Sequence, residues 1–351
     1  MGEVYFCDTE DGSVGLFNKK VDDIYHSTHG AYSESYEKFL LSSGFLDFIK
    51  KNEKVSILDV CYGIGYNTKV ALDEIIKLDK ILEVNIDALE YDKNLILISP
   101  LLKKQLIDNS INYFLIDNSN FNFGKNIFDV FKIFFDLNGF KYLNWQNLWY
   151  FCKKNKKRED KLPSRTNKVA FLHNIYYNYI SRRNKKGLKN NKFSKMNLSF
   201  HCEDARVTIQ ALKGQYNFIF HDGFTPKKLP TLWSLEFFKE LYRLLDDNGV
   251  LVTYSSSAAV RGAMIEAGFY IGCSLDKNNK RIGTIAVKNK SLIINELSEF
   301  DLELIKTKAG IFYRDKNLNA SAGQISALRN EEVKNSTRIT SSRLKKSYGK
   351  I

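Results

Sequence analysis

Carboxylate side chains follow three hydrophobic runs of this sequence, at the points where the runs end. The runs at 84–89, 198–202 and 218–221 are followed by Glu90, Asp204 and Asp222. Ligands of open α/β sheets bind outside the carboxyl ends of the strands, so three such acids would face one site. Glu90, which follows the second expected strand, could accept hydrogen bonds from both ribose hydroxyls of a nucleoside, and Asp204 could accept one from an adenine amino group. Taken singly, Glu90 could be an exposed carboxylate and Asp204 a helix cap, but together the acids favour a nucleoside-containing cofactor.

A glycine pair follows another hydrophobic run, at 55–60, which is the first expected strand. Gly63 and Gly65 would allow close approach of the backbone to a ligand and leave amide N–H groups free to bind it. Thr68 stands where a dinucleotide-binding fingerprint has its third glycine, so an ordinary turn remains open at this point.

The segment after Asp222 is rich in residues that stiffen a loop. It reads Asp-Gly-Phe-Thr-Pro-Lys-Lys-Leu-Pro-Thr-Leu-Trp from 222 to 233. A carboxylate that takes the proton of an amine, or orients it, suits transfer of a methyl group to nitrogen. Lys227 and Lys228 could contact a phosphate at the rim. The alternative is a proline-rich loop capped by an aspartate.

The elements that must position these residues alternate between strand and helix. Further strands are expected at 249–254, near Tyr270 and at 284–287, which predicts an α/β fold with a doubly wound sheet. Residues 1–54 read as an N-terminal addition that ends in a helix with an apolar face. A sheet domain then covers 55–305, and residues 306–351 form a basic tail.

A long insertion interrupts this domain at about 110–197. Residues 141–200 contain 16 Lys and Arg against Glu159 and Asp160, and the tail contains 11 against three acids. The formal net charge of the chain is +13, so the rest of the chain is acidic. Clustered bases on an acidic body suggest a polyanionic partner such as RNA, although a solvated charged surface would give the same count. Aromatic residues in the insertion, Trp145 among them, predict a small helical subdomain.

Several classes of protein are not expected. The five cysteines show no C-x-x-C pairing, which argues against a disulfide framework and a zinc site. No metal is expected. The N-terminus has no long apolar run, so we expect neither a signal peptide nor a membrane span, and therefore a cytoplasmic protein.

The run from Phe220 to Phe269 resembles the methyltransferase domain of the MnmC family. The resemblance is carried by D-G-F-x-P-x-K-x-P-x-x-W at 222–233, by the segments 254–261 and 266–269, and by Gly30 to Ser35 and Val60 to Asn67. It covers residues 1 to about 110 and about 197 to 290, and the segment 310–315 looks like the tail of stand-alone members.

The resemblance implies a Rossmann-like, S-adenosylmethionine-dependent methyltransferase whose last strand is antiparallel. It implies methylation of the aminomethyl nitrogen of 5-aminomethyl-(2-thio)uridine at the wobble position, with tRNA as partner. The implied cofactor residues are Tyr32, Glu34, Gly63, Gly65, Asn67, Glu90 and Asp204. Asp222 is the implied catalytic residue, and Phe224, Lys227, Lys228 and Arg261 are implied substrate contacts.

This chain departs from the family in three respects. No second glycine-rich strand-to-helix motif occurs, so the flavin-dependent oxidase activity of the fused proteins is not expected. Leu229 replaces the usual polar residue before the second proline, and the insertion at 110–197 has no counterpart in the fused proteins. The alternatives are another RNA base or a small amine as acceptor, aminopropyl transfer, and an inactive RNA-binding protein. The D-P-P-Y-like tetrad of enzymes that methylate base amines is absent.

Overall fold

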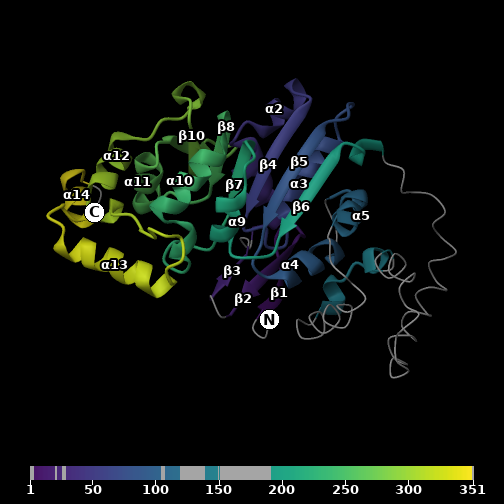
Figure 1. Cartoon of the computed structure of the whole chain (residues 1–351), viewed down its shortest axis with the longest axis horizontal. Coiled ribbons are helices and arrows are strands. Elements are labelled where there is room, and N and C mark those ends of the chain that lie inside the picture. Colours follow the sequence, from purple (N-terminus) through teal and green to yellow (C-terminus); the bar gives the residue numbers. More distant parts are fainter. Residues whose placement is uncertain are drawn as a thin grey trace.

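The computed structural model describes residues 4–19, 22–25, 29–103, 107–118, 139–148, 150 and 191–349. Its centre is a seven-stranded sheet with the order β6-β5-β4-β7-β8-β10-β9 (Figure 1). The strands are β4 (Lys54–Val60), β5 (Glu83–Leu89), β6 (Met196–His201), β7 (Tyr216–His221), β8 (Leu245–Thr253), β9 (Tyr270–Leu275) and β10 (Arg281–Val287).

Strand direction follows the pattern expected from the resemblance. β6, β5, β4, β7 and β8 run parallel, whereas β10 is antiparallel to both β8 and β9. The predicted α/β, Rossmann-like methyltransferase sheet is therefore confirmed, and each predicted strand is present within a few residues of its expected bounds. β8 begins at Leu245, four residues before the start expected at 249.

Two hydrophobic clusters sandwich the sheet, because both faces of its central strands are buried. Val55 and Ile57 of β4 belong to one cluster, and Leu58 and Val60 to the other. The helices of the first cluster are α2 (Phe45–Lys51), α3 (Tyr66–Ile76), α4 (Lys93–Ile98) and α5 (Asn109–Asn118), with the short helix η2 (Ser99–Leu101). The helices of the second are α9 (Ala205–Ala211), α10 (Leu235–Leu244), α11 (Ala258–Glu266) and α13 (Ala322–Asn335), with η6 (Pro230–Leu232).

The N-terminal addition contains a small antiparallel sheet that the sequence did not predict. β1 (Val4–Asp8), β2 (Val14–Asn18) and β3 (Asp23–Ile24) form it, and Figure 1 shows it near the carboxyl ends of the central strands. Helices α1 (Ala31–Glu34), η1 (Ser35–Leu41) and α2 follow. The predicted apolar helical face is present, since Phe39, Leu40, Phe45 and Ile49 are at most 1% exposed.

Part of the predicted insertion packs into the core. α5 supplies buried Ile111, Leu115 and Ile116, and η3 (Gly139–Tyr142) and η5 (Asn191–Phe193) lie at the ends of the described pieces. Tyr150 donates a hydrogen bond to Asp117 and its ring packs on Tyr113. The expected apolar stretch at 127–135, the basic run at 153–158 and the helix at 169–180 lie outside the described residues.

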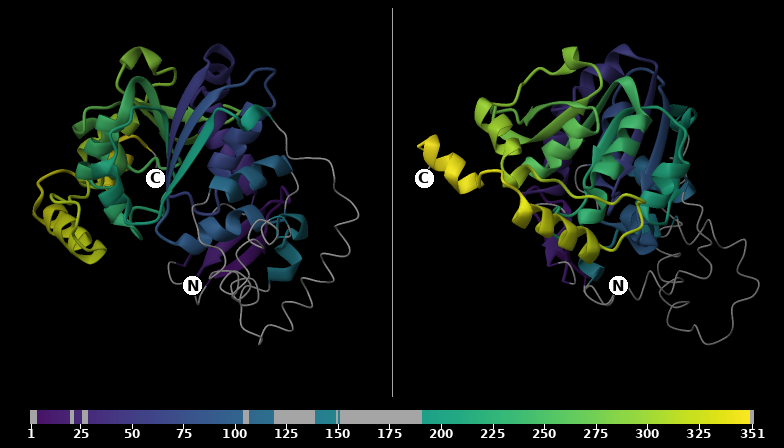
Figure 2. Two further views of the ribbon diagram at one scale, coloured as in Figure 1. Left: turned by 45° about the vertical axis from the view of Figure 1, so that its right-hand side comes forward. Right: turned by 60° about the vertical axis from the view of Figure 1, so that its left-hand side comes forward.

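The C-terminal segment is folded helical structure rather than an extended tail. It comprises α12 (Glu299–Lys306), η8 (Lys308–Gly310), α13 and α14 (Ser341–Ser347). Figure 2 shows α13 and α14 at one edge of the molecule. η7 (Lys290–Leu292) connects β10 to this segment. No helix among the described residues is long and apolar enough to cross a membrane.

Candidate active site

The loop between β4 and α3 has the backbone conformation that glycine favours. Cys61, Gly63 and Gly65 have φ values of 70°, 56° and 78°. A Cβ atom on Gly65 would lie 2.2 Å from the Tyr62 ring, so only glycine fits there. Thr68, in place of a third glycine, donates a 2.6 Å hydrogen bond to the buried Asp59. The sequence thus folds the loop tightly against the end of β4.

Glu90 leaves the end of β5 and reaches across to this loop. One carboxylate oxygen accepts a 2.8 Å hydrogen bond from the Gly63 amide and the other a 2.9 Å bond from the Asp92 amide. Burial raises the pKa of Glu90 to about 7, although these hydrogen bonds oppose the rise. The predicted juxtaposition of Glu90 with the glycine loop is present.

Asp222 leaves the end of β7 on the other side of the same loop. It accepts a 2.9 Å hydrogen bond from the side-chain amide of Asn67, in the first turn of α3. Burial raises the pKa of Asp222 to about 7, and the negative charge of Glu34 adds to the rise. The side-chain oxygen of Asn67 is buried and has no hydrogen-bond partner among the residues that the structure describes. The site therefore holds a carboxylate that can exchange a proton near neutral pH, beside a free acceptor.

Lys38 and Tyr254 complete the surroundings of Asp222. Lys38 pairs with Glu34 one helical turn earlier, and its ammonium lies 6.0 Å from the centre of the Tyr254 ring. The Tyr254 hydroxyl donates a 2.8 Å hydrogen bond to the carbonyl of Gly223. Glu34 is therefore close enough to Asp222 for its charge to raise the pKa of that carboxyl.

The N-terminal sheet closes against the loop that follows Asp222. Tyr25 packs edge-on against Phe224, with 4.9 Å between ring centres, and a Cβ on Gly63 would lie 3.3 Å from the Tyr25 ring. Lys228 pairs with Asp23 at 3.3 Å, whereas Lys227 is exposed. Phe224 therefore lies beside the glycine loop. Lys228 connects the loop that follows Asp222 to the N-terminal sheet through its ion pair with Asp23.

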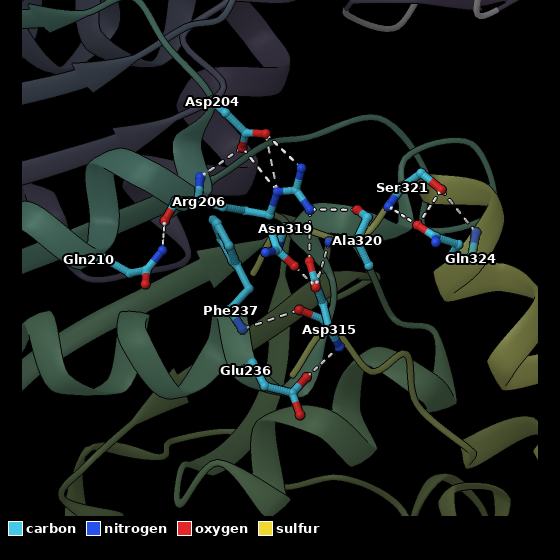
Figure 3. A network of polar contacts seen from close by, with 11 residues as sticks. Asp204, Arg206, Gln210, Glu236, Phe237, Asp315, Asn319, Ala320, Ser321 and Gln324 are labelled. Atoms are coloured by element: carbon cyan, nitrogen blue, oxygen red, sulfur yellow. Dashed lines mark hydrogen bonds and ion pairs between the residues drawn. The ribbon is translucent and has the colours of Figure 1, made fainter. Parts of the chain in front are cut away.

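Asp204 caps α9 and is held by a network that reaches the C-terminal segment (Figure 3). The Arg206 guanidinium binds Asp204 at 2.7 Å and Asp315 at 2.8 Å. Burial alone would raise the pKa of Asp204, but the hydrogen bonds from Arg206 hold it below its usual value. Asp315, which is 2% exposed, also accepts from the Asn319 and Ala320 amides, and its own amide donates to Glu236 at the start of α10. The alternative interpretation of Asp204 as a helix cap is correct. Its carboxylate nevertheless remains just after the carboxyl end of β6.

A substitution at Asp315 tests whether this network supports cofactor binding. Asp315→Asn should weaken S-adenosylmethionine binding several-fold, on the order of 1 kcal/mol, because Arg206 loses a charged partner and holds Asp204 less firmly. Single-turnover methylation at saturating cofactor should be unchanged. Calorimetry measures the affinity, and Lys316→Gln at the exposed neighbouring residue serves as control. Equal affinities in wild-type protein and a folded Asp315→Asn variant would assign the network to stability alone.

Two predicted site residues lie elsewhere. The Arg261 side chain is buried, with hydrogen bonds to Thr284 at 2.9 Å and Gly283 at 3.3 Å and an ion pair with Asp301 at 3.3 Å. It joins α11 to β10 and α12, so its position in the family motif reflects packing. The Tyr32 ring stacks beside Tyr36, 6.4 Å away between ring centres. Burial raises the pKa of Tyr32, and Lys77 beyond the far end of α3 opposes the rise, which puts the hydroxyl away from the glycine loop.

Tyr25, Lys38, Arg206 and Asp315 were not predicted to serve the site. The only available signals were the adjacency of Arg206 to Asp204 and the four-residue spacing of Lys38 from Glu34. Nothing in the sequence marks Tyr25, because its place depends on a sheet that was not predicted. Among the described residues, no group of three or more His, Cys, Asp or Glu side chains is arranged to hold a metal ion.

Comparison with known proteins defines the class of this site. Residues 167–289 match the family model described as S-adenosyl-L-methionine-dependent methyltransferase. The crystal structure of MnmC2 from Aquifex aeolicus superposes with a TM-score of 0.63 at 24% identity, covering 95% of this chain and 86% of that one. Residues 167–289 of the chain thus match S-adenosylmethionine-dependent methyltransferases, the whole chain shares the fold of MnmC2, and the matched family indicates S-adenosylmethionine as the cofactor.

Sequence relatives narrow the resemblance further. An uncharacterised protein of Methanocaldococcus jannaschii, MJ0670, is 29% identical over 324 residues, which are 92% of this chain and 70% of that protein. The tRNA 5-methylaminomethyl-2-thiouridine biosynthesis bifunctional protein MnmC of Burkholderia vietnamiensis is 39% identical over 72 residues. That match spans 20% of this chain and 11% of the bifunctional protein. The resemblance to the methyltransferase part of MnmC proteins is therefore confirmed.

Proposed function

We propose that the chain transfers a methyl group from S-adenosylmethionine to the aminomethyl nitrogen of 5-aminomethyl-(2-thio)uridine at the wobble position of tRNA. The product is 5-methylaminomethyl-(2-thio)uridine. The observation that carries this proposal is Asp222, a carboxylate whose pKa burial raises to about 7, in the D-G-F loop at the end of β7. The MnmC relatives, which are named for this modification, support the choice of acceptor.

The state of the acceptor explains the need for such an acid. A primary alkylamine has a pKa near that of a lysine side chain, about 10.4, so it reaches the site as an ammonium. An ammonium has no lone pair and cannot attack a methyl group until it loses a proton. Asp222 in its charged form can bind the ammonium, and its raised pKa narrows the gap between proton donor and acceptor. Glu34 adds a second negative charge that attracts the cation.

The residues of the loop fit the cofactor. When bound, S-adenosylmethionine supplies an electrophilic methyl group on a sulfonium sulfur. Gly63 and Gly65 would let the backbone approach it, Glu90 would accept from the ribose hydroxyls, and Asp204 from the adenine amino group. The free side-chain oxygen of Asn67 offers a further acceptor at the end where Asp222 and Glu34 lie. Phe224, Lys227 and Lys228 would contact the nucleotide at the rim.

Overall the reaction breaks the carbon–sulfur bond and forms a carbon–nitrogen bond. The proton released from the acceptor nitrogen passes to Asp222. Tyr25 and Phe224, packed together beside the loop, would help to exclude water from the reacting atoms.

A comparison of acceptors tests the proposal. The purified chain is incubated with S-adenosylmethionine and with tRNA whose wobble uridine carries the aminomethyl group, or with an unmodified transcript of the same tRNA. We expect methylation of the first only. Equal methylation of both would point to another RNA base, and methylation of small amines alone to a different substrate class. Cofactor binding without any transfer would support the inactive RNA-binding alternative.

A further inference from the structure

The chain from the end of α13 through α14 contains several exposed cations, and Glu331 and Glu332 precede the first of them by three and two residues. Residues 333–349 contain five basic residues and no acid, namely Lys334, Arg338, Arg343, Lys345 and Lys346. All five side chains are exposed, and the salt bridges of the described residues do not include any of them. In the preceding segment, by contrast, Lys306 pairs with Glu303 and Arg314 with Glu236.

The part of the chain that carries these cations packs against the rest of the C-terminal segment. Leu344 of α14 is 5% exposed and α14 packs against α12, while the Lys308 amide donates a 2.9 Å hydrogen bond to the carbonyl of Ile339. Because successive helical residues are about 100° apart, a buried Leu344 directs Lys346 to the outer face, with Arg343 and Lys345 on its flanks. The cations of α14 therefore lie on the outer side of a helix that is packed against α12.

The helix that leads to these cations, α13, starts at the rim of the candidate active site. α13 packs against η6, which ends the loop that begins at Asp222, and buried Ile325 shares a cluster with Leu232 and Trp233. Arg329 lies 4.8 Å from the centre of the Tyr313 ring and donates to the carbonyl of Ile311. Figure 3 shows the start of α13, at Ser321 and Gln324, beside the Asp204 network. At about 1.5 Å per residue, the helix carries the chain some 20 Å outward from there to the cations.

We propose that the surface formed by Lys334, Arg338, Arg343, Lys345 and Lys346 binds the phosphate backbone of the RNA whose base enters the active site. This inference rests on the proposed function, since it takes tRNA as the substrate. When a nucleotide of the RNA binds beside Asp222, the rest of the RNA lies outside the site. From the rim of the site α13 runs outward to the five cations, for which the described residues show no ion pair. The neighbouring hydroxyls, including Ser336, Thr337 and Ser342, are typical phosphate contacts. Leu344 of α14 is buried, and the exposed apolar residues beside it, Ile339 and Tyr348, lie among five cations, which favours RNA over a lipid surface.

Matched charge variants test this surface. The test variant carries Arg338→Gln, Arg343→Gln, Lys345→Gln and Lys346→Gln. The control carries Lys50→Gln, Lys51→Gln, Lys213→Gln and Lys290→Gln, four exposed lysines near the amino-terminal ends of the parallel strands. Both lose four positive charges, and circular dichroism checks that both fold.

We expect the test variant to bind tRNA at least about tenfold more weakly at moderate salt. Each lost phosphate contact should also flatten the slope of log affinity against log salt by about 0.7 to 0.9. The weaker binding should raise KM for tRNA, while kcat and S-adenosylmethionine affinity stay at wild-type values.

Three results would overturn the proposal: an unchanged salt slope, an equal loss in the control variant, or a loss of binding to anionic vesicles without a loss of tRNA binding. Binding of tRNA is measured without methyl transfer. Failure of the proposed function, seen as wild-type protein that methylates nothing, is thus distinguishable from failure of this surface.

Discussion

Asp222→Asn should lower single-turnover methylation about 10²–10⁴-fold while leaving S-adenosylmethionine affinity nearly intact. The asparagine keeps the size of the side chain and its contact with Asn67, but it cannot accept the proton of the incoming ammonium. Rapid-quench measurement with saturating cofactor isolates the chemical step. Turnover at the wild-type rate would remove Asp222 from the reaction.

The pH dependence gives an independent signature of the same residue. Because burial raises the pKa of Asp222 to about 7, the wild-type rate should rise with pH through that value as the carboxylate ionises. The step should be absent in Asp222→Asn. A raised carboxylate pKa also means that its contribution to stability is present below its ordinary value of 3.8 and is lost as the pH rises through about 7. At pH 8 the variant should therefore be no less stable than wild type, so unfolding cannot account for lost activity.

Glu90→Ala should weaken S-adenosylmethionine binding by about 1–3 kcal/mol, the cost of losing a charged hydrogen-bond acceptor. The affinity of the wild-type protein should also fall as the pH drops below about 7, since protonation of Glu90 removes one acceptor for the ribose. Calorimetry at several pH values measures both effects.

Glu83→Ala provides the matched control, because Glu83 begins the same strand and pairs with Lys54 at the opposite end of the sheet. It should bind the cofactor with wild-type affinity. If Glu90→Ala bound equally well, the ribose contact would have to be sought elsewhere.

The central strands β4 and β7 could be predicted from the sequence because most of their residues are apolar and buried. β5 and β6 could be predicted because buried residues alternate along them with more exposed ones. The same reasoning brought Glu90, Asp204 and Asp222 to one end of the sheet, since the carboxyl ends of parallel strands share an edge. The three-stranded N-terminal sheet was missed because β3 has only two residues and β1 and β2 are short. Their pairing is fixed by tertiary contacts such as the 2.9 Å hydrogen bond from the Val14 amide to the Tyr66 hydroxyl.

Residues matched through a motif were harder to place. Arg261 is part of the family pattern, but a motif does not separate a buried arginine that joins two elements from one that binds substrate. Asp315 lies 111 residues beyond Asp204 in the sequence, and only the fold brings both to Arg206. Long-range ion pairs of this kind have no periodic signal, so the link between the C-terminal segment and the site required the structure.

Mass analysis of wobble nucleosides in cells that lack this protein tests the proposed methylation in vivo. We expect that 5-methylaminomethyl-(2-thio)uridine disappears and that its 5-aminomethyl precursor accumulates. Wild-type protein should restore the methylated nucleoside, and Asp222→Asn should not. Wobble nucleosides identical to those of the parent cells, with no accumulated precursor, would contradict the proposed function.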